Sequence, residues 1–544
     1  MSHRQWPLLA LLTCFLPSLF YAAEPEELWK QASANGVAVN DIFARTRRMV
    51  HAWLSYADKE TLLLPDRLPG LIRGKQNTQL LYTPENSGAD NYPYLIITSW
   101  FTDPALYHGR MMDMLRNEIR YTNVSGAIPG NLDFKTRQLG PATLFGAGEY
   151  CKDGLLSVTE LLGRTPWYYR MVDITEDYMR KAPVQTRWGN LPDTGAELNG
   201  DVLQTLARLI PMTADPRFLD WATRIGDAYV EEILPANNYL PGYRYDFEKK
   251  TDSGTTRLRD HGNETIVGLV LLHALETDLG LKRAERTRPV IRKMLDNVLA
   301  SANPDGMLYN TIVNSDLSPR DTRLSDNWGY VYGALYAFYQ TTGEEKYRQA
   351  VRRVLSNLPK YRGYDWEAGS ADGYADSIES AIYLVAREPV PEAQSWIESE
   401  MKTLLAYQQP DGTIERWYGD GNWNRTLLLY AMMKTQGCYL KDWAPGVELG
   451  AVQQDGTLYV SLRSGKAWTG KLAFDYARHR RELNLRKNYV RLNEWPEWFT
   501  VDENTLYTVQ KARGAAQLLL GSELKNGLAL QLAAGETVKI AVSR

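Results

Sequence analysis

A polar cluster runs directly into an apolar helix at residues 259–279, RDHGNETIVGLVLLHALETDL. Behind the cluster, apolar residues fill most positions from 265 to 279, which predicts a helix buried on more than one side. Asp260 and Glu264 are four residues apart at its opening turn, so they share one helix face. Surface helices do not usually begin in this way, and we expect this one to begin at the rim of a cavity.

Five further clusters of polar and aromatic residues each lead into an apolar helix in the same way. They are residues 90–94 (DNYPY), 149–153 (EYCKD), 326–330 (DNWGY), 372–376 (DGYAD) and 420–425 (DGNWNR). Helices of mixed polarity, such as 217–233, 289–299, 344–358 and 394–407, alternate with the apolar ones. An inner ring of apolar helices inside an outer ring that faces water explains this alternation.

We therefore predict an (α/α)6-like toroid of about six hairpins over residues 24–440, with the polar clusters as arcs of one cavity rim. A solenoid of helix pairs is the alternative architecture. A solenoid would not confine polar clusters to the starts of its buried helices, so the toroid is favoured.

After residue 445 the apolar period changes from helical to alternating. Segments 457–463, 470–474, 506–509, 516–520, 528–532 and 538–542 have the pattern of strands, and Gly-containing turns separate several of them. This pattern predicts a second domain, an antiparallel β-sandwich over residues 445–544. Its longest connections contain 478–481 (RHRR) and 494–498 (EWPEW), and we expect them to reach back over the mouth of the toroid.

Residues 1–23 have the pattern of a secretory signal peptide: a basic start at Arg4, an apolar run over 8–20 and a small-residue exit. The apolar run is too short for a membrane span, and no later segment reaches about 18 apolar residues. We expect an exported bacterial protein, periplasmic or secreted, without a membrane span. Removal of the leader leaves Cys151 and Cys438, which favours buried free thiols over a single bridge and excludes a disulfide framework.

The composition is that of a folded soluble protein, with 44% hydrophobic and 23% charged residues among 544. A formal net charge of −3 argues against nucleic acid as a partner. The chain has six His, too few to favour a multi-histidine metal site, and it lacks credible nucleophile-elbow, phosphate-loop, zinc-protease and dinucleotide motifs. We therefore expect no metal and no cofactor.

The cluster at 259–264 is the strongest candidate for catalysis. Asp260, His261 and Glu264 are proton-transfer candidates, and Asn263 is a hydrogen-bonding candidate; capping of the helix by Asp260 is the alternative interpretation. Among the other clusters, Asp326 and Asp153 are further catalytic candidates. The substrate-binding candidates are Glu149, Tyr150, Asn263, Trp328, Tyr330, Asp372, Tyr374, Asp376, Trp423, Asn424 and Arg425.

Three of these assignments follow from side-chain chemistry. Trp328 and Tyr330 offer aromatic rings for the apolar face of a sugar, although core packing after a helix cap is the alternative. Arg425 is suited to a bidentate grip on a carboxylate. Glu149 and Asp153, four residues apart, are either cavity groups or a solvated ion-pair face.

The helical alternation, the polar and aromatic clusters at inner-helix starts and the C-terminal strands resemble the six-hairpin glycosidases and the related toroid polysaccharide lyases. The resemblance is architectural and covers the whole mature chain. It implies an enzyme that cleaves glycosidic bonds in oligo- or polysaccharides containing uronic acid. No family motif transfers residue by residue, so the candidate residues rest on their local patterns.

Two chemistries remain open. Hydrolysis needs one protonated and one ionised carboxyl group, for which Asp260 or Glu264 would pair with Asp326, Asp153 or Asp372. A polysaccharide lyase, acting by β-elimination, would use His261 with Asn263 or a tyrosine instead. The number of clustered carboxyl groups favours hydrolysis. A non-catalytic periplasmic glycan-binding protein is the third hypothesis.

Overall fold

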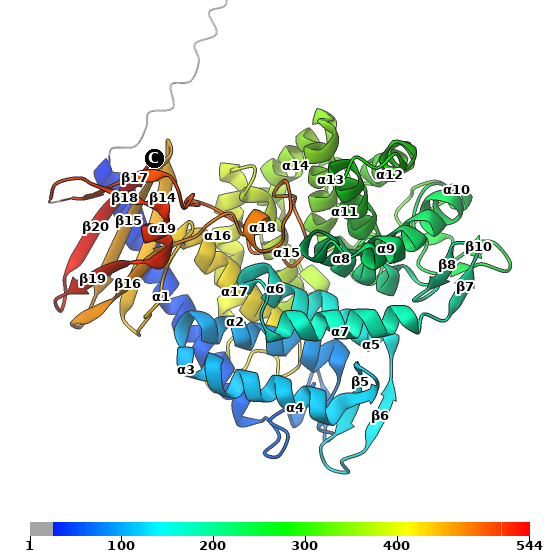
Figure 1. Cartoon of the computed structure of the whole chain (residues 1–544), viewed down its shortest axis with the longest axis horizontal. Helices are drawn as coiled ribbons and strands as arrows, with labels where there is room; N and C mark the ends of the chain where they lie inside the picture. Colours follow the sequence, from blue (N-terminus) through cyan, green and yellow to red (C-terminus); the bar gives the residue numbers. More distant parts are fainter. Residues whose placement is uncertain (1–24, 513) are drawn as a thin grey trace, which may run out of the picture.

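The computed structural model describes residues 25–512 and 514–544 (Figure 1). The predicted leader, residues 1–23, lies outside the described residues. Helices dominate the chain up to residue 435, and the longer strands lie between residues 438 and 543. Within the described ranges, no helix is both long enough and apolar enough to cross a membrane.

Seven helices, buried along most of their length, form a closed inner ring. They are α2 (Tyr92–Thr102), α6 (Leu156–Leu162), α8 (Ala196–Thr213), α11 (Glu264–Asp278), α13 (Trp328–Thr342), α15 (Ala371–Val385) and α17 (Asp420–Thr435). Each packs on the next, α6 reaching α8 through the preceding turn, and α17 returns to α2. The described residues thus contain an inner ring as predicted, but it has seven helices rather than about six, because the sequence analysis did not recognise the polar start of α8.

Outer helices alternate with the inner ones along the chain. They are α1 (Pro25–Ser55), α4 (Met112–Thr122), α7 (Pro166–Arg180), α9 (Pro216–Ala228), α12 (Arg283–Ala300), α14 (Glu345–Asn357) and α16 (Pro391–Ala406). In α14 the buried residues Tyr347, Val351, Val354 and Leu355 recur at three- and four-residue spacing, and charged residues fill the other face. This one-sided pattern is what a helix between a core and water requires.

Two inner helices are entered through π-helical turns at the rim of the ring. Turn η1 (Pro84–Asn91) leads into α2, and turn η3 (Tyr150–Leu155) continues α5 (Leu144–Glu149) into α6. Such turns are rare in proteins and frequently lie at functional sites. Here they carry Asp90, Lys152 and Asp153.

The predicted strands form two antiparallel sheets. The larger has the order β14 (Val447–Gln454), β15 (Thr457–Ser464), β20 (Thr537–Ser543), β17 (Leu506–Lys511) and β18 (Gln517–Leu520). The smaller has the order β13 (Cys438–Leu440), β16 (Trp468–Phe474) and β19 (Leu528–Leu532). Strands β13 and β14 were not predicted, and the packing of the two sheets as a sandwich stays a prediction.

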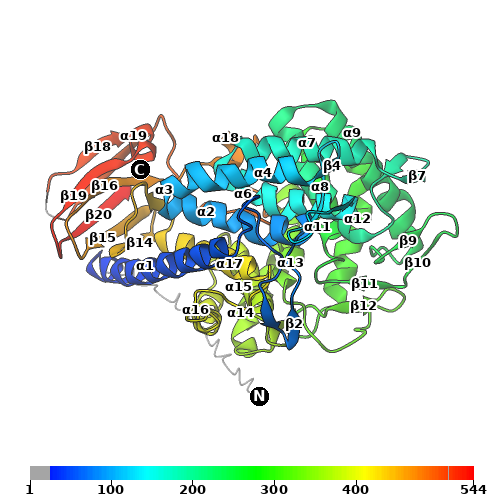
Figure 2. The ribbon, with the colours of Figure 1, turned by 90° about the horizontal axis from the view of Figure 1, so that it is seen from below.

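Helix α1 connects the sheets with the toroid (Figure 2). Its C-terminal half lies beside the inner helices, and its N-terminal half packs on β14 and β15. A Cβ atom on Gly450 of β14 would lie 2.2 Å from the carbonyl oxygen of Ala32, so this close approach requires glycine. Asn35 Nδ2 donates to the Ala451 carbonyl oxygen at 2.9 Å across the same contact.

A largely irregular segment, residues 475–499, closes the ring at the C-terminal ends of the inner helices; we call it the plug. It contains the short helix α18 (Arg478–Arg481) and lies among the inner helices in Figure 1. Gln340 near the end of α13 donates to the Asn488 carbonyl oxygen, and Asn484 donates to the Pro211 carbonyl oxygen in the last turn of α8. The prediction that these connections cover the toroid mouth is therefore wrong, because the inner helices begin at the opposite end.

Candidate active site

A cavity of about 410 Å³ opens where the inner helices begin. Every inner helix, or the turn that leads into it, supplies at least one lining residue. The acidic lining residues are Glu85, Asp90, Glu149, Asp153, Glu197, Asp260, Glu264, Glu367, Asp372 and Asp376, and the basic ones are Arg73, Lys152, Arg257, Arg259 and Arg425. With this excess of carboxyl groups in a confined space, some must retain their protons at neutral pH.

Asp153 is the carboxylate that its neighbours hold ionised. Lys152 Nζ lies 2.9 Å from Asp153 Oδ1 and 3.0 Å from Glu264 Oε1. Asn493 Nδ2 donates a further hydrogen bond to Asp153 Oδ1 at 2.9 Å. Burial alone would raise the pKa of Asp153, but the charge of Lys152 and side-chain hydrogen bonds from Glu149, Lys152 and Asn493 outweigh burial and keep that pKa below its ordinary value.

The carboxyl groups next to Asp153 have raised pKa values instead. Asp201, fully buried in α8 with its Oδ1 3.8 Å from Lys152 Nζ, has its pKa raised to about 8 by burial. Burial and the charges of Asp201 and Asp153 raise the pKa of Glu149 well above its usual range. Since one lysine faces several carboxyl groups, the negative charge concentrates on Asp153.

Asp90 lines the same cavity from turn η1. Burial raises the pKa of Asp90 well above its ordinary value, and the charges of Asp153 and Asp372 raise it further. Asp90 therefore keeps its proton under conditions in which Asp153 has lost one. Two carboxyl groups whose environments separate their pKa values in this way can act as an acid and a base, or as an acid and a nucleophile.

A second group of carboxylates surrounds Arg259, just before α11. The Arg259 guanidinium lies 3.3 Å from Asp260, 3.3 Å from Asp326 and 3.1 Å from Glu367. Burial and the charge of Asp260 raise the pKa of Asp326 to about 7. Arg259 is thus neutralised within the protein, where it positions carboxyl groups.

His261 combines a half-exposed ring with a strained backbone. Its φ of 69° lies in the left-handed region, which costs a non-glycine residue about 1–2 kcal/mol. Nδ1 of the ring pairs with the Glu197 carboxylate, and burial of the ring lowers the pKa of His261. Arg73 and Glu367, which also line the cavity, have φ values of 45° and 47°. Such strain collects at functional sites.

Arg425 lies at the bottom of the cavity, and both terminal nitrogens of its guanidinium donate to the protein. The guanidinium lies 2.5 Å from Glu379 Oε2 and 3.1 Å from Asp376 Oδ1, and it also donates to Tyr94 and Asn493. Because these partners occupy the guanidinium, the predicted bidentate grip on a substrate carboxylate is not available to it. We assign Arg425 the task of fixing the floor of the cavity.

The cavity gathers nine of the residues singled out from the sequence. They are Glu149, Asp153, Asp260, His261, Glu264, Tyr330, Asp372, Asp376 and Arg425. Seven others lie outside its lining: Tyr150, Asn263, Asp326, Trp328, Tyr374, Trp423 and Asn424. Asp326 nevertheless adjoins the cavity through Arg259.

The predicted sugar-stacking rings of Trp328 and Trp423 are core residues. Both are fully buried, and their indole N–H groups donate to Ser377 Oγ at 3.1 Å and to the Leu404 carbonyl oxygen at 2.8 Å. Neither ring can therefore present a face to a sugar. The aromatic residues that do line the cavity are Phe145, Tyr330, Trp417 and Tyr418.

The other residues outside the lining serve the packing of the ring. The buried amides of Asn263 and Asn424 donate to Asn327 Oδ1 at 3.2 Å and to the Tyr94 carbonyl oxygen at 3.1 Å. Tyr150 is fully buried, and Tyr374 is buried with its ring 6.1 Å from that of Tyr407. These side chains hold neighbouring elements together.

Several residues that line the cavity, or that contact its lining residues, were missed by the sequence analysis. Asp90 belongs to a recognised cluster but was not selected as a site residue, and Trp417 and Tyr418 lie just before the cluster at 420–425, which was drawn too narrowly. Glu197 and Asp201 form the polar start of α8, and the segment AELNGD at 196–201 carried the same signal as the other clusters. Asn493 carried no signal, because it lies in an irregular segment remote in sequence.

Cys151 and Cys438 are buried free thiols, as favoured from the sequence. Burial raises the pKa of Cys151 to about 12, which makes its thiol unreactive. In residues 25–512 and 514–544, no group of three or more His, Cys, Asp or Glu is placed to hold a metal ion.

No family model and no curated protein matches the chain. Among solved structures, it is similar to the α-1,6-mannanase of Salegentibacter sp. HEL1_6, with 12% identity, 59% of this chain and 96% of that chain covered, and a TM-score of 0.42. It is also similar to a family 76 glycoside hydrolase (mannosidase) of Bacteroides thetaiotaomicron VPI-5482. The identity is 11%, 72% of this chain and 99% of that chain are covered, and the TM-score is 0.42. A third similar structure is the unsaturated glucuronyl hydrolase of Bacillus sp. GL1, with 14% identity, 54% of this chain and 87% of that chain covered, and a TM-score of 0.38.

By name, these solved structures are a mannanase, a mannosidase and a glucuronyl hydrolase. The TM-scores lie below 0.5 and the identities below 15%. The proposed function therefore rests on the residues of this chain alone.

Proposed function

We propose that the protein is a glycoside hydrolase in which Asp90 is the general acid and Asp153 is the ionised carboxylate. The observation that carries the proposal is the separation of their pKa values inside one cavity, Asp153 lowered and Asp90 strongly raised. Cleavage of a glycosidic bond needs an acid to protonate the leaving oxygen and a carboxylate to activate water or attack the anomeric carbon. Phe145, whose ring is exposed, supplies an aromatic surface for the sugar.

One observation favours β-elimination as the second candidate. Burial lowers the pKa of His261, and if the Nδ1–H of the neutral ring donates to Glu197, Nε2 has the lone pair that a base requires. Tyrosine is the weaker candidate base. Burial and the charges of Asp376 and Glu379 raise the pKa of Tyr330, and burial with the charge of Asp90 raises that of Tyr418. Since elimination also needs a donor for the developing carboxylate charge, and the cavity has excess acid, hydrolysis is preferred.

A glycan panel separates these possibilities. Purified protein would be incubated with alginate, polygalacturonate, hyaluronan, chondroitin and unsaturated oligosaccharides made from them, with mannan and xylan as neutral members. New reducing ends without an ultraviolet chromophore, or loss of the chromophore of an unsaturated substrate, support hydrolysis. Appearance of a chromophore overturns hydrolysis in favour of elimination, and binding without any turnover favours the non-catalytic hypothesis.

The expected pH dependence of hydrolysis follows from the two carboxyl groups. As the pH falls through the low pKa of Asp153, this group gains a proton and kcat/KM falls. As the pH rises through the high pKa of Asp90, the acid loses its proton and kcat/KM falls again. We expect a bell-shaped profile, and Asp90→Asn should remove the alkaline limb while lowering turnover about 10²- to 10⁴-fold. An alkaline limb that persists in the residual activity of Asp90→Asn would exclude Asp90 as the acid.

A basic pocket beside the cavity is the part of the surface best suited to bind the acidic substrate expected from the sequence. A second pocket of about 410 Å³ is lined by Arg67, Arg73 and Lys75 without any carboxylate, and it shares Arg73, Trp417 and Tyr418 with the cavity. Arg73 pairs with Glu415 at 3.4 Å, whereas Arg67 and Lys75 form no ion pair within residues 25–512 and 514–544. We propose that a sugar carboxylate or sulfate one or more units from the cleaved bond binds there, while the acidic cavity takes the sugar at that bond.

The double variant Arg67→Ala, Lys75→Ala tests this pocket. Because exposed ion pairs contribute about 0.2–1 kcal/mol each, KM for an acidic oligosaccharide should rise about threefold to tenfold with little change in kcat. The effect should shrink in high salt, and a neutral oligosaccharide should be unaffected. An equal rise in KM for acidic and neutral oligosaccharides would show that the pocket does not recognise charge.

We also propose that the protein is exported, as the predicted leader indicates. Locating the protein in cell fractions tests this proposal.

A further inference from the structure

Asn493 of the plug reaches through the ring to the floor of the cavity. Its Nδ2 donates to the Lys152 carbonyl oxygen at 3.0 Å and to Asp153 Oδ1 at 2.9 Å, and its Oδ1 accepts from Arg425 Nη1 at 3.1 Å. A guanidinium can only donate, so the amide cannot be reversed without losing all three bonds. Asn493 therefore presents its N–H donor to the carboxylate that the proposed function needs ionised.

The backbone conformation at Asn493 and the hydrogen bonds of its two neighbours fix the position of its side chain. Its φ is 62°, in the left-handed region that asparagine tolerates better than most residues, and its side chain is buried. The preceding carbonyl, that of Leu492, accepts from Arg208 Nη2 at 2.7 Å. The following side chain, Glu494, forms two 2.7 Å bonds with Arg387. Both neighbours of Asn493 are thus bound to inner helices or to the residues that follow them.

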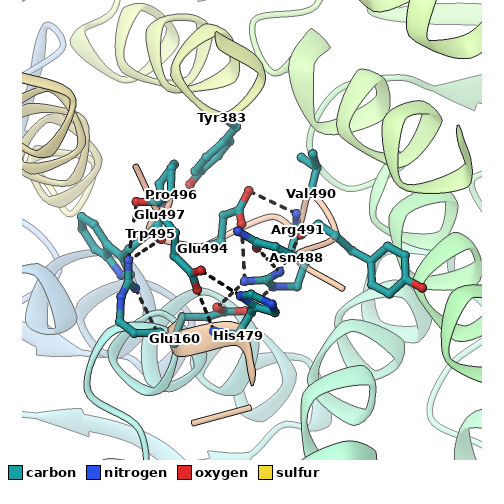
Figure 3. Close-up of polar contacts among 12 residues, drawn as sticks. Glu160, Tyr383, His479, Asn488, Val490, Arg491, Glu494, Trp495, Pro496 and Glu497 are labelled. Carbon is teal, nitrogen blue, oxygen red and sulfur yellow. Dashed lines mark hydrogen bonds and ion pairs between the residues drawn. The ribbon is translucent and has the colours of Figure 1, made fainter. Parts of the chain in front are cut away.

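A buried charge network holds the plug (Figure 3). Glu160 at the end of α6 accepts from Arg491 at 2.9 and 3.0 Å and from Arg208 at 2.9 Å. Trp495 Nε1 donates to the Ser157 carbonyl oxygen at 2.9 Å. These bonds fix the segment on either side of Asn493 to the toroid, so the position of its amide is determined by buried contacts.

We propose that Asn493 is a positioning residue that orients Asp153 and holds it ionised, so that the C-terminal part of the chain completes the active site formed by the helices. This inference rests on the proposed function, because it assigns a partner to Asp153. Removing the amide would leave Asp153 with Lys152 as its charged partner, and protonation of Asp153 would become easier. Substrate contacts higher in the cavity would be unchanged.

The test compares Asn493→Gly and Asn493→Asp with the unmodified protein on the glycan of the panel that is turned over fastest. Glycine accepts the φ of 62° and removes the amide, so the fold is preserved. We expect kcat to fall about tenfold to a hundredfold, KM to change less than about threefold, and the acid limb of the pH profile to move up by about one unit. Asn493→Asp, which replaces the donor with a carboxyl group, should move the acid limb further.

Asn484→Gly is the matched control. Asn484 lies in the same plug and has a φ of 56°, but it donates to the Pro211 carbonyl oxygen at 2.9 Å, whereas Asn493 donates to Asp153. Its replacement should leave kcat and the pH profile unchanged. A lower kcat with an unmoved acid limb in Asn493→Gly, or an effect equal to that of the control, overturns this inference alone. An active Asp153→Asn overturns the proposed function and this inference with it.

Discussion

Asp153→Asn is expected to lower kcat/KM about 10³- to 10⁴-fold, at the upper end of what one acid–base group contributes. The amide has nearly the shape of the carboxylate, yet it can neither attack an anomeric carbon nor take a proton from water. The fold should tolerate the change. Lys152 keeps Glu264 3.0 Å from its ammonium and Asp201 3.8 Å away, and either group can ionise to replace the lost charge.

Asp201→Asn is the control for that experiment. The pKa of Asp201 is raised to about 8, so this carboxyl is already neutral at neutral pH and an amide reproduces its charge. Its replacement should change turnover less than about threefold, since no charge is lost. Oligosaccharide binding, measured by calorimetry, should persist in both variants. If Asp153→Asn retained a tenth of the activity, or Asp201→Asn lost as much as Asp153→Asn, the assignment of Asp153 would fail.

The periodicity of the sequence predicted the elements closely because long apolar patterns leave few alternatives. The helix predicted over 265–279 is α11 (Glu264–Asp278), and the strand predicted over 457–463 lies inside β15 (Thr457–Ser464). The polar starts of the inner helices also located the cavity. Both the apolar periodicity and the polar helix starts are local patterns, and local patterns can be recognised in a single sequence.

Which side chains of a cluster face the cavity was not predictable from the same pattern. An inner helix is buried all round, so its apolar periodicity does not indicate which side faces the ring axis. Trp328 and Tyr330 are two positions apart, and therefore about 200° apart around α13. Tyr330 lines the cavity, whereas Trp328 bonds to Ser377 of α15. Only the packed ring decides between these two directions.

The floor of the cavity depends on contacts between residues far apart in sequence. Asn493 and Asp153 are separated by 340 positions, and the plug has neither a helical nor an alternating pattern. For Arg425, the side-chain chemistry was recognised but its buried environment was not. Its guanidinium chemistry was recognised, but its partners Glu379 and Asn493 could not be, so a buried positioning residue resembled a substrate ligand.

Arg491→Ala is expected to lower the free energy of unfolding by about 3–5 kcal/mol, because it removes one partner of a buried ion pair and leaves charge uncompensated. Arg491 and Glu160 are both buried, with Arg491 Nε 2.9 Å from Glu160 Oε1. Urea unfolding measures the change. Arg486→Ala, an exposed position in the same plug, should stay within about 0.5 kcal/mol of the parent.

The same network predicts the direction of the acid dependence of stability. Burial alone would raise the pKa of Glu160, but the charges of Arg491 and Arg208 outweigh it and lower that pKa to about 2. A group whose pKa is lower in the folded than in the unfolded state stabilises the fold above the unfolded value of 4.5. That contribution, about 3 kcal/mol, is lost as the pH falls from about 4.5 towards 2.

In Arg491→Ala this acid-sensitive contribution should be reduced, so the variant and the parent should approach each other in stability at low pH. A stability difference that stayed constant from neutral to acid pH would contradict the pairing of Arg491 with Glu160. Because Arg208 binds both Glu160 and the Leu492 carbonyl oxygen, loosening the network also loosens the residue before Asn493. Turnover in Arg491→Ala should therefore decline at urea concentrations below those that unfold the chain.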